Sequence, residues 1–171
     1  MKKKIVLILV LLLVLVTGCG KSNLKEIKLS DKEFGYTTTF SYPEKEVYTE
    51  PEEDHSGKTT EITFKNEELD LEFEMYYIES RKATYDNLKK SRSEKKYFNE
   101  YKFGDYEAYM YGEYTSGAYL NILLEDENDM AKAIFVSVSR LDTKEEVVVA
   151  DVVNDKKVQE LFKSIKVKKE K

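Results

Sequence analysis

The sequence has very little cysteine, histidine or proline, and it has no tryptophan. Its 171 residues include one Cys, one His and two Pro. A single cysteine excludes an intramolecular disulfide and the paired-cysteine motifs of zinc sites and redox proteins. A Ser-His-Asp or Cys-His catalytic site would have to use His55, the only histidine. The sequence contains no Gly-rich phosphate loop and no H-E-x-x-H or G-x-S-x-G motif.

Arginine is also scarce, since the 28 Lys and Arg residues include only Arg81, Arg92 and Arg140. Together with many Tyr, Glu and Asn residues, this bias indicates an AT-rich genome and favours a low-GC Gram-positive source. The composition, 41% hydrophobic and 36% charged, is that of a globular chain. The formal net charge is −5, and removal of the lysines at positions 2–4 would make it −8. Such an acidic chain is poorly suited to bind nucleic acid.

The first 19 residues follow the three-part pattern of an export signal. Lys2, Lys3 and Lys4 form a basic start, and Ile5–Val16 is an uninterrupted apolar run of about 12 residues. As a helix this run would be about 18 Å long, whereas a bilayer core is about 30 Å thick. We therefore interpret the run as the apolar part of a signal peptide, because it is too short to span a membrane stably.

The end of this segment, Val16-Thr17-Gly18-Cys19, resembles the lipobox of bacterial prolipoproteins. The resemblance implies transfer of a diacylglyceryl group to the Cys19 thiol and cleavage between Gly18 and Cys19, followed in some bacteria by N-acylation, for example with palmitate. It implies a cell-membrane lipoprotein anchored on the extracytoplasmic face, where two or more acyl chains hold a protein stably. We predict a signal peptide at 1–18 and a lipidated tether at 19–25.

Alternating apolar and polar residues predict strands along most of the mature chain. We expect strands near 27–30, 34–42, 59–65, 71–78, 106–115, 118–124, 131–140 and 165–167, with a hairpin between the third and fourth. Thr84 is expected to cap a helix to about Lys96, and Asn154 a second helix to Ser164. A long exposed loop is expected over 44–58. The segment 143–153 fits either a short helix or a strand.

This order of elements predicts an α+β fold, in which two or three helices pack on a single antiparallel sheet. We place that single domain at 26–168, followed by a basic tail at 169–171. A strand ending in Phe40-x-Tyr42-Pro43, an early helix, a three-strand meander and a closing helix also resemble the PsbP-type fold. That resemblance implies a fold but no activity, since its members bind diverse partners.

Three acidic clusters contain residue types that reactive sites use. His55 follows Glu52, Glu53 and Asp54, which together could bind a divalent metal, but one histidine in a flexible acidic loop is poorly preorganised. The run 125–129 fails as an EF-hand from Asp126, because Ala131 and Ser137 occupy its glycine and glutamate positions. Glu72 and Glu74 have the spacing of paired carboxylates, but so does every acidic strand face. We therefore expect no catalytic residue, metal or cofactor.

Two features are spread over the chain. Residues 44–79 contain 13 acidic and 3 basic residues, whereas 81–96 contain 7 basic and 2 acidic residues. The basic helix could lie against anionic lipid or wall polymer, although its cations more simply pair with the protein's own acidic strands. Seven of the 13 tyrosines lie between positions 97 and 119. They could stack a ligand or serve as amphipathic sheet residues.

The resulting hypothesis is a non-enzymatic binding or accessory domain tethered to the membrane, with a membrane-protein or envelope-polymer partner. One alternative is a metal- or carboxylate-dependent hydrolase of envelope material, and another is a structural partner of a membrane protein complex. A pocket joining His55 or several carboxylates would favour the enzyme. A broad tyrosine-rich patch without such a pocket would favour binding.

Overall fold

The computed structural model describes residues 23–46, 48–57, 59–95, 97–113, 117–141 and 155–170. The predicted signal peptide, Cys19 and the ambiguous segment 143–153 therefore lie outside the described residues. Neither helix of the described chain has the length and apolar character needed to cross a bilayer.

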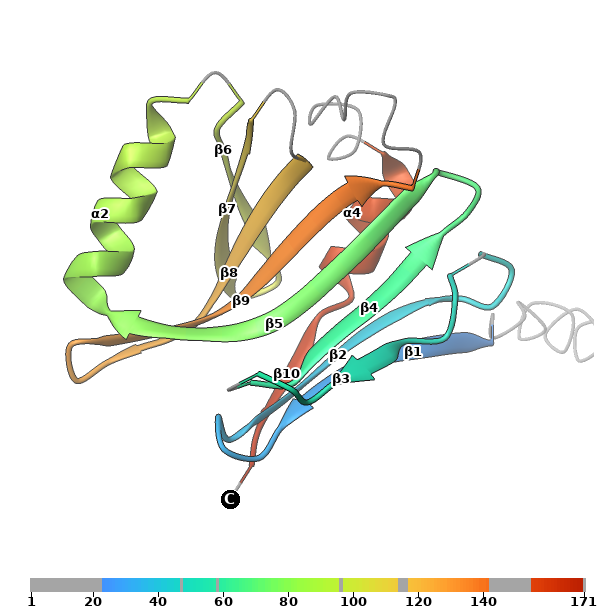
Figure 1. The fold of residues 1–171 in the computed structure, drawn as a ribbon, viewed down its shortest axis with the longest axis horizontal. Helices are drawn as coiled ribbons and strands as arrows, with labels where there is room; N and C mark the ends of the chain where they lie inside the picture. The colour runs from blue at the N-terminus through green and yellow to red at the C-terminus, as the bar shows by residue number, and fades with distance from the viewer. Residues whose placement is uncertain are drawn as a thin grey trace, which may run out of the picture.

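The described strands form two antiparallel sheets, as Figure 1 shows. The larger has seven strands in the order β3-β4-β5-β9-β8-β7-β6, and the smaller has three in the order β1-β2-β10. The strands of the larger sheet are β3 (Glu52–Asp54), β4 (Glu61–Asn66), β5 (Leu71–Arg81), β6 (Asn99–Phe103), β7 (Tyr106–Glu113), β8 (Gly117–Glu127) and β9 (Met130–Arg140). Those of the smaller sheet are β1 (Leu24–Asp31), β2 (Tyr36–Pro43) and β10 (Lys166–Lys169).

The expectation of one antiparallel sheet with helices packed on it, possibly PsbP-like, is wrong. Strands hold 59% of the described residues and helices 16%, and the strands divide between two sheets. Alternation revealed the strands but not their partners. The decisive pairing joins β2 near the start of the chain to β10 at its end, with Thr39 opposite Lys166. That contact is too distant in sequence for a local pattern to reveal.

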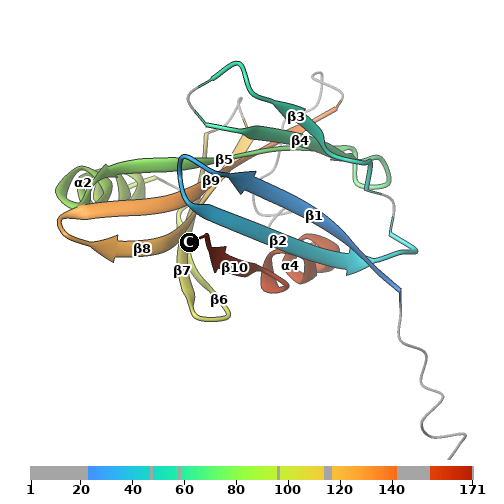
Figure 2. The same ribbon diagram turned by 90° about the horizontal axis from the view of Figure 1, so that it is seen from below.

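The main core lies between the two sheets. Large buried side chains of β4, β5 and β9 face those of β1 and β2, including Phe40 and Phe73, which are both fully buried. The second described helix, α4 (Lys156–Lys163), lies beside the smaller sheet in the same layer, as Figure 2 shows. Its Phe162 ring lies 5.7 Å from the Phe103 ring and 6.2 Å from the Phe40 ring. The helix therefore fills the part of the layer that the three short strands leave uncovered.

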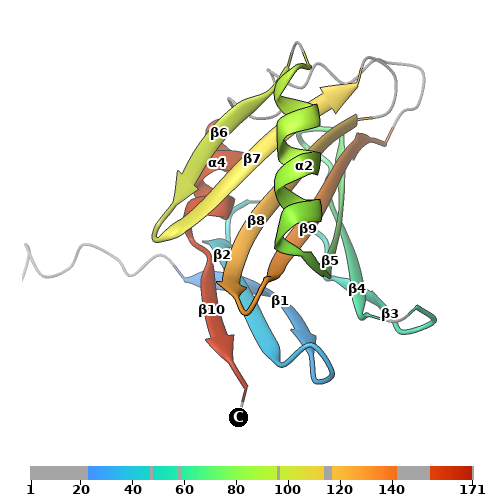
Figure 3. The same cartoon turned by 90° about the vertical axis from the view of Figure 1, so that its left-hand side faces the viewer.

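The first helix, α2 (Lys82–Ser93), packs on the opposite face of the large sheet, where it crosses β7, β8 and β9 in Figure 3. Tyr85 is its only buried residue and joins a small cluster with Tyr109, Ala131 and Ala133. The predicted Thr84 cap is wrong, because the helix begins one turn earlier, after Arg81, without a side-chain cap. Since β5 runs directly into α2, the chain enters this helix without a separate capping turn.

Two other sequence predictions are confirmed. β4 and β5 form the expected hairpin, and β9 is the central strand of the large sheet.

Three local predictions differ from the structure. The expected loop over 44–58 instead contains β3 and the buried Tyr48. α4 begins close to the predicted place, but its cap is Asp155, whose carboxylate accepts hydrogen bonds from the backbone of Lys157 and Val158. The acidic run after Leu124 proves to be mostly strand, with a tight turn only at residues 128–129.

Candidate functional site

One described cavity is a polar groove where the β1–β2 turn meets the segment between β3 and β4. It has a volume of about 360 Å³ and is lined by residues of both segments, among them Asp31, Glu33, His55 and Thr60. A neighbouring hollow of about 320 Å³ shares Asp31 and Glu33 and extends to Glu79. The fold thus brings His55 near carboxylates of another element, an arrangement that could suit an enzyme.

Asp31 has a structural role in this groove. One carboxylate oxygen accepts a hydrogen bond from the Phe34 backbone N–H at 2.8 Å, and the other accepts one from the Thr60 N–H at 2.7 Å. Burial alone would raise the pKa of this carboxyl, but the backbone N–H groups of Thr60, Phe34 and Glu33 outweigh burial and lower it. Asp31 therefore stays ionised and joins the small sheet to the start of β4, and it has no proton to donate near neutral pH.

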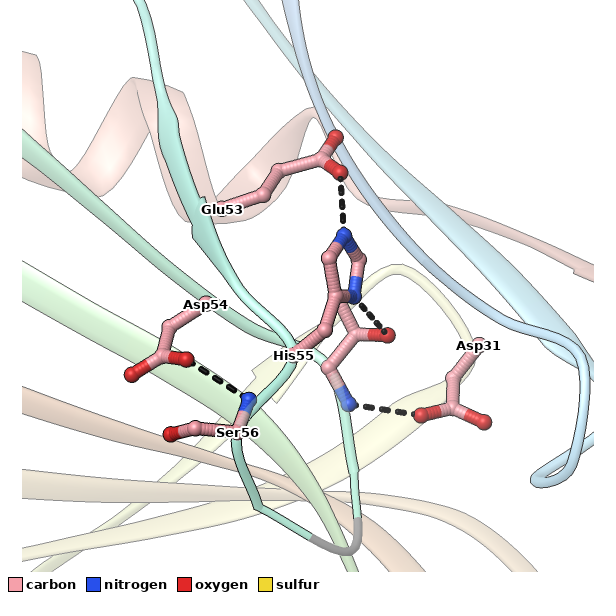
Figure 4. A network of polar contacts seen from close by, with 6 residues as sticks. Asp31, Glu53, Asp54, His55 and Ser56 are labelled. Atoms are coloured by element: carbon pink, nitrogen blue, oxygen red, sulfur yellow. Dashed lines mark hydrogen bonds and ion pairs between the residues drawn. The ribbon is translucent and has the colours of Figure 1, made fainter.

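His55 lies between a carboxylate and a hydroxyl, as Figure 4 shows. Its Nε2 is 3.1 Å from Glu53 Oε2, and its Nδ1 is 3.3 Å from Thr60 Oγ1. This order resembles a nucleophile–base–carboxylate relay, but the His55 and Glu53 side chains are 65% and 58% exposed. The Thr60 backbone N–H is already bonded to Asp31, so it is not free to stabilise an oxyanion.

The predicted acidic cluster around His55 does not converge on one point. Successive strand residues point to opposite faces, so Glu53 reaches His55 while Asp54 turns away and accepts a hydrogen bond from the Ser56 backbone. Among the described residues, no group of three or more His, Asp or Glu side chains is placed to hold a metal ion. The alternation of side chains along the strand therefore separates acidic residues that are consecutive in the sequence.

A second candidate surface lies on the outer face of the large sheet, the face on which α2 packs. Half-buried aromatic side chains form a continuous row across β5, β9, β8 and β7. The ring centroids of Tyr76 and Phe135 are 5.1 Å apart, those of Phe135 and Tyr119 5.8 Å, and those of Tyr119 and Tyr111 5.3 Å. The Arg92 guanidinium of α2 lies 4.7 Å from the Tyr111 ring centroid, which places a cation at that end of the row.

At its other end, the outer face becomes acidic. Cross-strand partners project from the same face, and Glu61 is opposite Tyr76 while Thr63 is opposite Glu74. Burial, followed by the nearby charges of Glu61 and Glu72, raises the pKa of Glu74. Glu72 forms an ion pair with Lys65 at 3.4 Å. Of the two carboxylates noted in the sequence, Glu72 is therefore neutralised, whereas Glu74 has no ion-pair partner among the described residues.

The register continues this acidic surface onto β3. Asp54 is opposite Glu61, and Glu52 is opposite Thr63. Two parallel rows of side chains therefore cross the sheet, each with carboxylates at the β3–β4 edge and aromatic rings toward β8 and β7. We call this surface the aromatic–acidic face and define it by Glu52, Asp54, Glu61, Glu74, Tyr76, Phe135, Tyr119 and Tyr111.

The tyrosines noted in the sequence divide between the two faces. Tyr97, Tyr101 and Tyr106 pack against the core between the sheets, whereas Tyr109, Tyr111 and Tyr119 lie on the outer face. Tyr114 lies outside the described residues. Sequence reasoning missed Tyr76 and Phe135, because only the pairing of β5 with β9 places those two rings side by side.

Two basic residues of α2 form ion pairs with neighbouring strands, although not with the acidic stretch at 44–79. Lys82 pairs with Asp86 on the helix and with Asp126 of β8, the latter at 3.6 Å. Lys89 pairs with Glu100 of β6 at 2.7 Å. The helix also lies at the opposite end of the molecule's long axis from the start of β1 (Figures 1 and 2).

Comparisons with known proteins give no relative to this chain. No protein-family model, curated protein or solved structure matches it.

Proposed function

We propose that this protein is a membrane-anchored extracytoplasmic lipoprotein whose folded domain binds a partner without catalysing a reaction. The observation that carries the binding role is the aromatic–acidic face, a continuous row of half-buried rings bordered by carboxylates. Tyrosine and other aromatic residues are enriched at protein interfaces, because they contribute large contact areas with little loss of conformational entropy.

The ring geometry favours a protein partner over a sugar polymer. Tyr111, Tyr119 and Phe135 stack on one another at interplanar angles of 28° and 30°. Rings that stack in this way cover one another's faces and direct edges and hydroxyl groups outward. A sugar-binding platform uses exposed ring faces, whereas edges and phenolic hydroxyls suit the mixed polar and apolar surface of a protein.

The anchor is supported by the sequence pattern that ends in Gly18-Cys19. Four residue steps separate Cys19 from Asn23, and a fully extended chain of that length spans about 14 Å. The Asn23 carbonyl accepts a hydrogen bond from the Glu44 N–H at 2.9 Å, which ties the start of the described chain to the end of β2. A lipid on Cys19 would therefore hold this end of the domain close to the membrane, with α2 at the far end.

The anchor is tested by replacing the modified thiol. Cys19→Ala is expected to abolish incorporation of radiolabelled fatty acid and to leave the protein unprocessed or released into the medium. Gel mobility, labelling and membrane fractionation measure these outcomes. Unchanged membrane retention together with unchanged mobility would contradict lipidation.

The binding role is tested by site-specific photo-crosslinking in intact cells. A photoreactive phenylalanine analogue at position 135 samples the aromatic–acidic face, and the same analogue at the exposed Leu88 of α2 is the matched control. We expect a discrete crosslinked product from position 135 that is missing from position 88. Identical products from the two positions, or none from either, would refute a binding role for this face.

The envelope hydrolase remains a second candidate because of one observation, the alignment of Glu53, His55 and Thr60 in the groove. This candidate predicts that the full-length protein degrades purified peptidoglycan and that His55→Ala abolishes the reaction. A wild-type protein without turnover would exclude a peptidoglycan hydrolase. The same measurement leaves the binding proposal intact, because His55 is not part of the aromatic–acidic face.

A further inference from the structure

Several carboxylates of the large sheet pair with lysines, among them Glu79 with Lys132 at 3.5 Å and Glu100 with Lys89 at 2.7 Å. On the aromatic–acidic face, Glu52, Asp54, Glu61 and Glu74 have no ion pair with any described residue, although Asp54 accepts a hydrogen bond from the Ser56 backbone N–H. The negative charges of these four carboxylates are therefore uncompensated and can interact with an external cation.

Tyr76 lies at the centre of this uncompensated charge. Glu61 is its cross-strand partner, and Glu74 projects from the same face two residues earlier on β5. Burial and the nearby charges of Glu74 and Glu61 raise the pKa of the Tyr76 hydroxyl. Its ring also contacts the Phe135 ring. Carboxylates beside an aromatic edge can hold a guanidinium or ammonium group, because the carboxylates accept its hydrogen bonds while the apolar part of its side chain packs on the rings.

We propose that the aromatic–acidic face binds a Lys- or Arg-rich segment of a protein partner, with cationic side chains at Glu61 and Glu74 and apolar side chains along the aromatic row. This inference deepens the proposed binding function and rests on it. The charge of the face decides the class of partner, because anionic lipid headgroups, anionic wall polymers and nucleic acids would all be repelled by these carboxylates.

The dimensions fit a short segment. Adjacent strands lie about 4.8 Å apart, so the distance from β3 to β7 across β4, β5, β9 and β8 is about 24 Å. An extended peptide rises about 3.3 Å per residue, and roughly seven residues would cross the face. Basic residues would occupy the β3–β4 end of that path and apolar residues the end toward β8, where the Arg92 cation would disfavour a basic residue.

The test uses a synthetic probe and the full-length protein in nonionic detergent. The probe is the hexapeptide Arg-Lys-Arg-Leu-Leu-Trp, and because the protein has no tryptophan, probe fluorescence reports binding directly. We expect saturable binding that weakens as salt is raised. The variant Glu61→Gln/Glu74→Gln should weaken it by about tenfold or more.

The matched control is Glu44→Gln/Glu67→Gln, which removes two exposed carboxylates in turns away from the face. If the probe recognises this face, the control should change its affinity by no more than about twofold. Equal losses in the two double variants would overturn the proposal, because the probe would then sense only the net negative charge. Phe135→Leu should also weaken binding, and unchanged affinity would remove the aromatic row from the site.

A second probe, Glu-Asp-Glu-Leu-Leu-Trp, separates this inference from the proposed function. If the acidic probe binds the face as tightly as the basic one, the cationic partner is wrong while the face remains a binding surface. If neither probe binds and position 135 yields no specific crosslink in cells, both proposals fail. A specific crosslink to a partner whose contact segment lacks Lys and Arg would also refute the cationic partner alone.

Discussion

Tyr76 and Tyr77 are neighbours in the sequence and project from opposite faces of the same sheet. Tyr77 is 1% exposed and stacks on Phe34 at 4.7 Å. Its hydroxyl oxygen lies 2.9 Å from both the Leu29 carbonyl oxygen and the Thr38 hydroxyl oxygen, so it can hydrogen-bond to both groups, with its single hydrogen donated to one of them. Tyr76 is half-buried beside two carboxylates. The inner tyrosine thus joins the two sheets, whereas the outer one belongs to a surface whose charges are left uncompensated.

The difference shows that residue type alone does not indicate the role of an aromatic side chain in this protein. On the inner face, rings pack against a second sheet and α4, and the Tyr77 hydroxyl finds partners within the protein. On the outer face, rings pack mainly against one another along a single sheet. Stability should therefore depend on the inner aromatics, and recognition on the outer ones.

The largest expected effect compares two phenylalanines. Phe73 is fully buried against Phe64 and Phe162, whereas Phe135 is half-buried on the outer face. Phe73→Ala should lower the free energy of unfolding by about 3–5 kcal/mol, since it leaves a cavity in the core. Phe135→Ala should cost about 1 kcal/mol. Urea denaturation followed by circular dichroism measures the free energy of unfolding of both variants. Similar losses of stability in the two would show that the inner and outer aromatics do not differ in their contribution to stability.

A smaller loss is expected at the join between the sheets. Asp31→Asn keeps the shape of the side chain but removes the negative charge that accepts the Phe34 and Thr60 N–H groups, and should cost about 2 kcal/mol near neutral pH. The lowered pKa of Asp31 means that the carboxylate stabilises the fold above its ordinary pKa, 3.8, and that this contribution is lost as pH falls through the lower folded pKa. Denaturation of the wild-type protein and of Asp31→Asn should be measured from pH 7 to pH 3. The difference between their free energies of unfolding should narrow only at the acidic end of this range.

The two adjacent hydroxyl groups give a finer comparison. Tyr77→Phe leaves the buried Thr38 hydroxyl without one of its partners and should lower stability by about 1 kcal/mol. Tyr76→Phe should change stability by less than about 0.5 kcal/mol, because its hydroxyl lies at the surface. Thermal unfolding of the two variants in parallel checks the prediction. A larger loss at position 76 would mean that the outer hydroxyl also has a structural role.

The smallest expected effect has the opposite sign. The raised pKa of Glu74 means that its ionised form is disfavoured in the folded state, so Glu74→Gln should stabilise the protein at pH 7 by about 0.5 kcal/mol. The gain should disappear as pH falls below the ordinary glutamate pKa, 4.5, where the carboxyl is protonated in both states. Glu100→Gln, which breaks an ion pair with Lys89, is the control and should bring no gain.

Much of the secondary structure was predictable, because alternation along β4, β5 and β9 reflects local burial. The architecture was not predictable, because nothing near Phe40 or Val167 indicates that β2 and β10 pair across almost the whole chain. The candidate surface was visible only in part. Its tyrosines stood out in the composition, but the approach of Tyr76 to Glu61 depends on a register that one sequence does not encode locally. Likewise, the sequence alone groups Asp54 with His55, whereas the structure directs the Asp54 side chain away from His55 and toward the Ser56 backbone.

The pairing of β1 with β2 has a mechanical consequence. The first described strand runs antiparallel to β2 over eight consecutive pairs, from Leu24 opposite Pro43 to Asp31 opposite Tyr36. A pull on the chain at Leu24, directed away from the domain along the strand axis, loads this ladder in shear. The hydrogen bonds then share the force and must yield together, whereas a pull across the strands would open them one after another. A domain suspended from this end would resist tension with the full length of its first strand.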